Sequence, residues 1–175
     1  MPGGAPPSTE ESTTDSPSSP ASTVATTAAT GGNGGAGGCD LMSPNTCETA
    51  EVLMEIAGDQ GMDFREVKGT GSKWFQIKIL EASTLGRPSF TATLTSAMGT
   101  DYDLYVSHGD ENGPDCTFPQ LQATGMPESF TQWWPDMATV DDSRHISLEI
   151  RHLSGGTCEE SAQWTLRVQG NTDPG

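Results

Sequence analysis

The sequence predicts an all-β domain: an antiparallel β-sandwich of the jelly-roll kind with one short N-terminal helix, preceded by a disordered tail. Three observations support this prediction. Five segments alternate apolar and polar residues, turns rich in Gly, Pro and Asp separate them, and the first 38 residues lack the apolar side chains of a core. Clean alternation is typical of antiparallel sheets that bury one face and expose the other to water.

The tail comprises residues 1–38. It contains no Lys, Arg or aromatic residue, its only charges are Glu10, Glu11 and Asp15, and it ends in a glycine-rich run at 31–38. Such a segment cannot bury enough apolar surface to offset its ordering entropy. We therefore expect a flexible tether at 1–38 and a folded domain at 39–175, the alternative being a tail without a role.

The domain begins with a helical pattern. Residues 43–46 supply capping side chains, and Ala50, Leu53 and Met54 then recur at helical spacing. This pattern predicts one short helix over 47–56.

Strands are predicted over the rest of the domain. The clear alternating segments are 74–80, 89–96, 101–107, 145–152 and 163–169, and weaker patterns occur near 64–67, 117–123 and 130–134. The residues predicted to face inward are Phe75, Ile77, Ile79, Phe90, Ala92, Leu94, Tyr102, Leu104, Val106, Ile146, Leu148, Ile150, Trp164, Leu166 and Val168. A length of about 130 residues suffices for a single core.

The charge balance excludes one class of partner. Lys and Arg number 8 against 24 Asp and Glu, a net charge of −16, so nucleic acid would be repelled. No apolar run approaches the ~20 residues of a membrane span, and we expect a monomer without a transmembrane segment. Neither a basic nor an apolar stretch follows Met1, so no signal peptide is visible, which leaves a cytosolic chain or a removed export signal.

Four cysteines favour export. Cys39, Cys47, Cys116 and Cys158 form no C-x-x-C pair and have no His at zinc-finger spacing. Two disulfides in an oxidising compartment are the simplest interpretation, which predicts a secreted or cell-surface protein; four free thiols in the cytosol are the alternative. Of three connectivities, closure of the shorter loops favours Cys39 with Cys47 and Cys116 with Cys158.

Several blocks carry a family resemblance. They are Asn45–Ala50, the Trp/Phe segment Gly71–Ile79, the segment Gly99–Val106 with its Asp-Leu-Tyr core, and the closing segment Gln163–Val168. Over about residues 45–170 the chain resembles the bacterial pre-peptidase C-terminal domain, and collagen-binding domains of bacterial collagenases are similar. The resemblance implies a non-catalytic β-sandwich of an exported protein. In several family members an acidic residue just before the Trp/Phe strand helps to bind calcium; Lys73 stands there in this chain, which implies that this site is altered or lost.

Acidic residues supply candidate metal or catalytic groups. Asp101 and Asp103 share one strand face roughly 6.6 Å apart, a spacing that suits calcium ligands, a carboxylate pair for glycoside hydrolysis, or acceptors for backbone N–H groups of a turn. A weaker calcium candidate is the oxygen-rich turn with Asp110, Asn112 and Asp115, whose alternative is a solvated turn. Calcium is thus the one cofactor the sequence raises.

Tryptophans supply candidate ligand contacts. Trp133 and Trp134 are adjacent, so on a strand they point to opposite faces and one indole can lie on the surface; Trp74 has the opposite parity from Phe75. An exposed indole could stack on a sugar or a partner protein, whereas two partly buried indoles would be structural.

These features predict a non-catalytic extracellular or cell-envelope module, tethered to a membrane anchor or fusion partner, that binds protein or polysaccharide through rim loops or exposed aromatics. The alternatives are a structural envelope protein without a specific ligand and a small hydrolase that uses Asp101 and Asp103.

Overall fold

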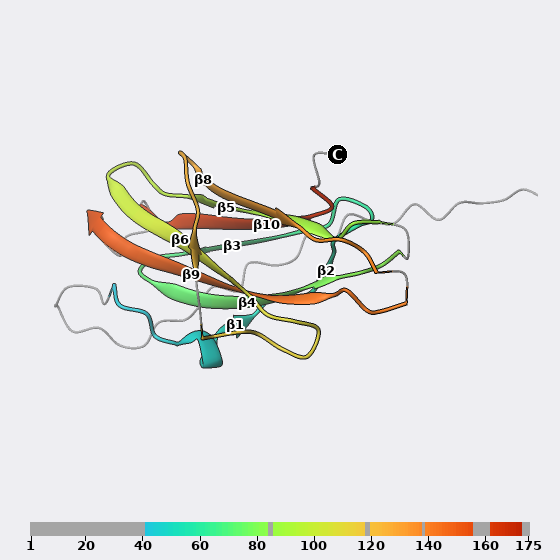
Figure 1. Ribbon diagram of the computed structural model, residues 1–175. Coiled ribbons are helices and arrows are strands. Elements are labelled where there is room, and N and C mark those ends of the chain that lie inside the picture. Colours follow the sequence, from blue (N-terminus) through green and yellow to red (C-terminus); the bar gives the residue numbers. More distant parts are fainter. Residues whose placement is uncertain (1–40, 84–85, 118–119, 138, 156–161, 173–175) are drawn as a thin grey trace, which may run out of the picture.

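The chain folds into a sandwich of two β-sheets (Figure 1). The structure, a computed structural model, describes residues 41–83, 86–117, 120–137, 139–155 and 162–172. The proposed tether at 1–38, Cys39 and Cys158 therefore lie outside the described residues. The predicted all-β sandwich is confirmed.

One layer is a six-stranded sheet in the order β1-β4-β9-β6-β7, with β2 also paired to β4. Its strands are β1 (Glu51–Val52), β2 (Ile56–Ala57), β4 (Lys73–Leu80), β6 (Thr100–His108), β7 (Leu121–Gln122) and β9 (Arg144–Gly155). The short strands β1 and β2 run parallel to β4, and the other pairs are antiparallel.

The second layer is a four-stranded antiparallel sheet in the order β3-β10-β5-β8. Its strands are β3 (Phe64–Gly69), β5 (Ser89–Thr95), β8 (Glu128–Trp133) and β10 (Trp164–Gly170). In Figure 1 these four strands form the upper layer, and β6, β9, β4 and β1 form the lower one.

The core lies between the sheets and contains every residue predicted to face inward. Period-two alternation is sufficient to predict this set, because successive side chains of a strand point to opposite faces. Trp164 packs at one end of the core. Its ring lies edge to face against the Phe75 ring, with 5.8 Å between the ring centroids, and its indole N–H donates to the Gly71 carbonyl at 2.8 Å. The Gly71 N–H in turn donates to the Tyr102 hydroxyl at 3.0 Å.

The predicted helix over 47–56 is wrong. Only Cys47–Thr49 forms a single 3₁₀ turn, and the chain then becomes extended at Ala50 (φ −57°, ψ 149°) and joins β4 as β1 and β2. A segment this short is a marginal helix on its own, whereas the edge of β4 offers backbone partners such as the Gln76 carbonyl, which accepts the Leu53 N–H at 2.7 Å. The other change is at 117–123, where Leu121–Gln122 is the one strand among the described residues 117 and 120–123.

Candidate functional site

Trp133 and Trp134 occupy opposite environments, which is the first of the two arrangements that the sequence left open. Trp134 is 2% exposed, joins the core and donates its indole N–H to the Asp142 carbonyl at 2.6 Å. Trp133, the last residue of β8, is 45% exposed. The Arg87 guanidinium lies 4.7 Å from the centroid of the Trp133 ring, a cation–π contact that orients the exposed indole.

Trp133 belongs to the outer face of the four-stranded sheet, which we call the threonine face. Inward positions of β5 and β10 fill the core, so the alternate positions face outward. The outward side chains are Phe64, Glu66, Lys68, Thr91, Thr93, Thr95, Ser129, Thr131, Trp133, Thr165, Arg167 and Gln169.

Lateral contacts organise this face. The register aligns Phe64, Gln169, Thr91 and Thr131 in one row across the four strands. The hydroxyls of Thr91 and Thr131 are 2.8 Å apart, and the Arg167 guanidinium lies 3.8 Å from the Phe64 ring centroid. The threonine face is therefore preorganised, with exposed aromatic rings on both edge strands, about 15 Å apart at ordinary strand spacing.

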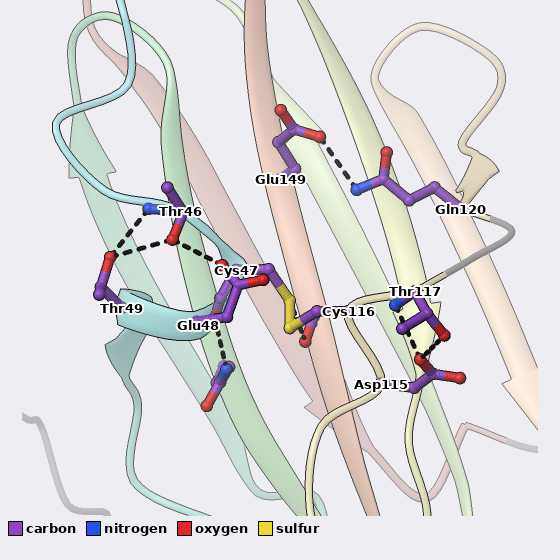
Figure 2. The surroundings of a disulfide bond; sticks show 11 residues. Thr46, Cys47, Glu48, Thr49, Asp115, Cys116, Thr117, Gln120 and Glu149 are labelled. Atoms are coloured by element: carbon purple, nitrogen blue, oxygen red, sulfur yellow. Dashed lines mark hydrogen bonds between the residues drawn. A yellow bond between two sulfur atoms is a disulfide. The ribbon is translucent and has the colours of Figure 1, made fainter.

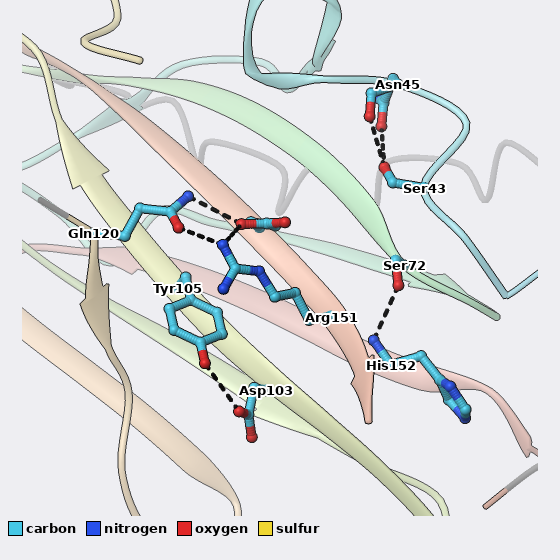
Figure 3. A network of polar contacts seen from close by, with 9 residues as sticks. Ser43, Asn45, Ser72, Asp103, Tyr105, Gln120, Arg151 and His152 are labelled. Carbon is cyan, nitrogen blue, oxygen red and sulfur yellow. Dashed lines mark hydrogen bonds and ion pairs between the residues drawn. The ribbon is translucent and has the colours of Figure 1, made fainter. Parts of the chain in front are cut away.

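Asp101 and Asp103 lie on the outer face of the other sheet in different surroundings. Asp101 is exposed beside the register shift of β6, whereas Asp103 is 8% exposed. The Tyr105 hydroxyl (3.2 Å) and the Gln122 amide (2.9 Å) both donate to Asp103 Oδ2, and the first of these bonds is drawn in Figure 3. The partners of Asp103 are thus side chains, where the sequence suggested backbone N–H groups of a turn.

The structure adds Glu128 to this pair. Glu128 begins β8 in the other sheet, and its Oε2 accepts the backbone N–H of Leu104 at 2.6 Å. Burial raises the pKa of Glu128, and the neighbouring Asp103 and Asp101 carboxylates raise this pKa further. Glu128 therefore bridges the two sheets at a local excess of negative charge.

A second polar network covers β9 on the same outer face (Figure 3). Arg151 forms an ion pair with Glu149 at 2.5 Å and donates to Gln120 at 2.6 Å, and its guanidinium lies 4.0 Å from the Tyr105 ring centroid. The pKa of Arg151 is raised, chiefly by its hydrogen bond to Glu149. Trp74 is opposite Glu149 in the register and half-buried, so it is less accessible than Trp133.

The disulfide differs from the favoured pairing. Cys47 is bonded to Cys116, with 5.8 Å between their Cα atoms, which excludes both Cys39–Cys47 and Cys116–Cys158 (Figure 2). Loop-closure entropy favours near neighbours in an unfolded chain, but here the sandwich brings the 3₁₀ turn and the segment after β6 together above β9. The Cys47 sulfur also contacts the Ser147 hydroxyl at 3.5 Å.

The turn with Asp110, Asn112 and Asp115 is organised by hydrogen bonds within the turn. Asp110 Oδ1 accepts the N–H groups of Asn112 (2.8 Å) and Gly113 (3.2 Å), and Asp115 Oδ1 accepts the N–H and hydroxyl of Thr117 (2.8 and 2.6 Å). These hydrogen bonds lower the pKa of both carboxyls. The turn follows β6, whereas Asp101 is near the start of that strand, so the two acidic groups do not meet.

Among the residues that the structure describes, no group of three or more His, Cys, Asp or Glu side chains is arranged to hold a metal ion. Calcium binding stays a prediction.

A shallow hollow between the end of β4 and residues 139–143 is lined by Lys78, Glu81 and Asp141, at the opposite end of the sheet from Asp101.

Comparison with known protein families finds no family model that matches the chain, and comparison with curated proteins finds no match. The described part of the chain contains no helix with the length and apolar character needed to cross a membrane.

Sequence reasoning missed Phe64, Arg167 and Glu128. The contacts of Phe64 and Arg167 depend on the pairing of β3 with β10, which are about a hundred residues apart in the chain. The outward threonines of β5 were visible as a Thr-x-Thr-x-Thr pattern, which is the signal that could have indicated the threonine face.

Proposed function

We propose that this chain is a non-catalytic binding module of an exported or cell-envelope protein, and that it binds polysaccharide through the threonine face. The observation that carries the proposal is Trp133, a large aromatic side chain that is 45% exposed and held in place by Arg87. An indole combines an apolar face with a polar edge, which suits the mixed C–H and hydroxyl surface of a sugar ring.

The composition of the threonine face favours polysaccharide over protein. Protein interfaces have a continuous apolar centre with a polar rim. Here the exposed rings of Trp133 and Phe64 lie at the two edges, and the rows between them carry hydroxyl, amide and guanidinium groups. Such spacing suits an extended oligosaccharide that lies across the strands.

The charge of the threonine face also favours its role as the glycan-binding surface. Lys68 and Arg167 accompany the single carboxylate Glu66 on the threonine face, although the whole chain carries −16. A neutral or anionic glycan therefore meets less repulsion here than elsewhere on the domain.

Three further points support the module and its compartment. The Cys47–Cys116 disulfide is typical of an oxidising environment. The resemblance to the pre-peptidase C-terminal domain implies a non-catalytic exported sandwich. Asp103, one member of the candidate catalytic pair, is 8% exposed with one oxygen already accepting two hydrogen bonds, an arrangement that favours a structural carboxylate.

The test is retention of the full chain on insoluble cellulose, chitin and xylan. We expect wild-type protein to be retained on at least one of them, Trp133→Ala to bind about tenfold or more weakly, and Trp133→Phe to fall between them. Met98→Ala is the matched control, because Met98 is an exposed large side chain beyond the other end of β5. Loss of folding is checked by circular dichroism.

Two outcomes contradict the proposal. If none of the three polysaccharides retains the protein, or if Trp133→Ala binds as tightly as wild type, the threonine face is not a polysaccharide site. That result would favour the alternative of a structural envelope protein without a specific ligand. Release of reducing sugar that is abolished in Asp103→Asn would instead support the hydrolase.

A further inference from the structure

All six methionines that the structure describes are on the surface. Their exposed fractions are 101% for Met98, 100% for Met126, 76% for Met42 and Met62, 59% for Met54 and 55% for Met137. The buried core of the described residues contains Ala, Leu, Ile, Val, Phe, Trp and Tyr but no methionine. This distribution is unusual because methionine is ordinarily among the more frequently buried residues.

Met98 and Met126 lie in neighbouring turns. Met98 is between β5 and β6, and Met126 is between β7 and β8. Because Leu94 near the end of β5 pairs with Glu128 at the start of β8, the two turns lie side by side at one end of the sandwich. At full exposure these side chains gain no burial energy, so packing does not explain an apolar residue at either position.

We propose that these surface methionines, and Met98 and Met126 above all, are oxidation sites at which the folded domain reduces hydroperoxides. The thioether sulfur attacks one peroxide oxygen, the O–O bond breaks, and the sulfoxide S–O bond forms. With hydrogen peroxide the departing hydroxide takes up the remaining proton as water, so the sulfur loses two electrons and the peroxide gains them.

The fold tolerates this reaction because of where the sulfur atoms lie. A sulfoxide is polar, and it disrupts a packed core. At Met98 and Met126 the new oxygen projects into water, and no core contact has to move. In the described residues the thioethers thus form an outer layer that consumes oxidant, while the core carries none.

The experiment treats the full chain with hydrogen peroxide, measures sulfoxide at each methionine by peptide mass mapping, and repeats the reaction on the urea-unfolded chain. We expect Met98 and Met126 to react within about twofold of their unfolded rates, Met54 and Met137 to be slower, and the thermal midpoint to be unchanged after oxidation.

Leu104→Met is the matched control, because Leu104 is fully buried and the exchange conserves volume. Its sulfur is expected to react at least about tenfold more slowly than in the unfolded chain. Leu148→Met, also fully buried, replaces it if that variant does not fold. Protection of Met98 or Met126 to the same degree, or loss of the cooperative transition on oxidation of wild type, would overturn the proposal.

Discussion

At the scale of single residues, His108 places a polar, titratable ring in apolar surroundings. Its ring lies against the rings of Phe90 and Phe130 at centroid distances of 6.2 and 5.8 Å, and among the described residues its Nε2 is buried without a hydrogen-bond partner. Burial lowers the pKa of His108, and the Arg144 charge lowers it further. The folded state therefore favours the neutral form of this imidazole.

A pH dependence of stability follows. Because the pKa of His108 is lower in the folded state than the ordinary value of about 6.5, the unfolded chain binds the proton more readily, and stability is lost as the pH falls through that range. We expect the thermal midpoint of wild type to fall between pH 7.5 and 5.5. His108→Phe removes the titrating group and is expected to show a flatter profile; parallel profiles would contradict this assignment.

At the scale of elements, the strands follow from local pattern and the lead-in segment does not. Phe75, Ile77 and Ile79 alternate so regularly that β4 is predictable within one residue. The helical spacing of Ala50, Leu53 and Met54 is outweighed by pairing with β4, and Met54 is then 59% exposed. The periodicity of apolar residues within a segment carries no information about whether a strand edge lies close enough to pair with it.

The Cys47–Cys116 disulfide joins this lead-in to the segment after β6. The cysteines are 69 residues apart in sequence, so the cross-link restricts a large loop of the unfolded chain. We expect the double variant Cys47→Ala/Cys116→Ala to lose about 2–5 kcal/mol of unfolding free energy in urea denaturation. Ser147→Ala is the control for the adjacent hydroxyl contact and is expected to lose about 1 kcal/mol. A double-variant loss no larger than that of the control would show that the bond does not stabilise the fold.

Glu128 forms a hydrogen bond between the two sheets, and we expect its substitution to increase the free energy of unfolding, whereas loss of the disulfide decreases it. In Glu128→Gln the side-chain oxygen can still accept the Leu104 N–H, while the repulsion from Asp103 and Asp101 is removed. We expect a gain of about 0.5 kcal/mol at pH 7 in urea denaturation. Since the pKa of Glu128 is raised, wild type is more protonated near pH 4, and the gain is expected to shrink there.

The control for Glu128 is Glu66→Gln, an exposed carboxylate of the same sheet that is opposite Arg167 in the register. It is expected to give no gain. A destabilised Glu128→Gln, or an equal gain in both variants, would count against local repulsion at Glu128.

At the scale of the whole molecule, the net charge of −16 opposes the compact state. We expect the thermal midpoint to rise between 10 and about 200 mM NaCl, because salt screens this repulsion over about 8–10 Å. Calcium chloride at matched ionic strength separates screening from specific binding: an additional rise that chelator removes would support the calcium hypothesis, and equal midpoints would oppose it. A midpoint that falls with NaCl would show that attractive ion pairs dominate.

The sequence by itself determined the five clearly alternating strands β4, β5, β6, β9 and β10 and the inward-facing residues of each, because side-chain alternation along a strand is a local property. It also placed Trp133 and Trp134 on opposite strand faces, with one exposed indole or two partly buried indoles as the alternatives. Only the tertiary structure decided that Trp133 is the exposed one, that Cys47 is bonded to Cys116, and that Glu128 lies beside Asp103. These are contacts between segments far apart in the chain, and sheet order and register, which local periodicity does not encode, set them.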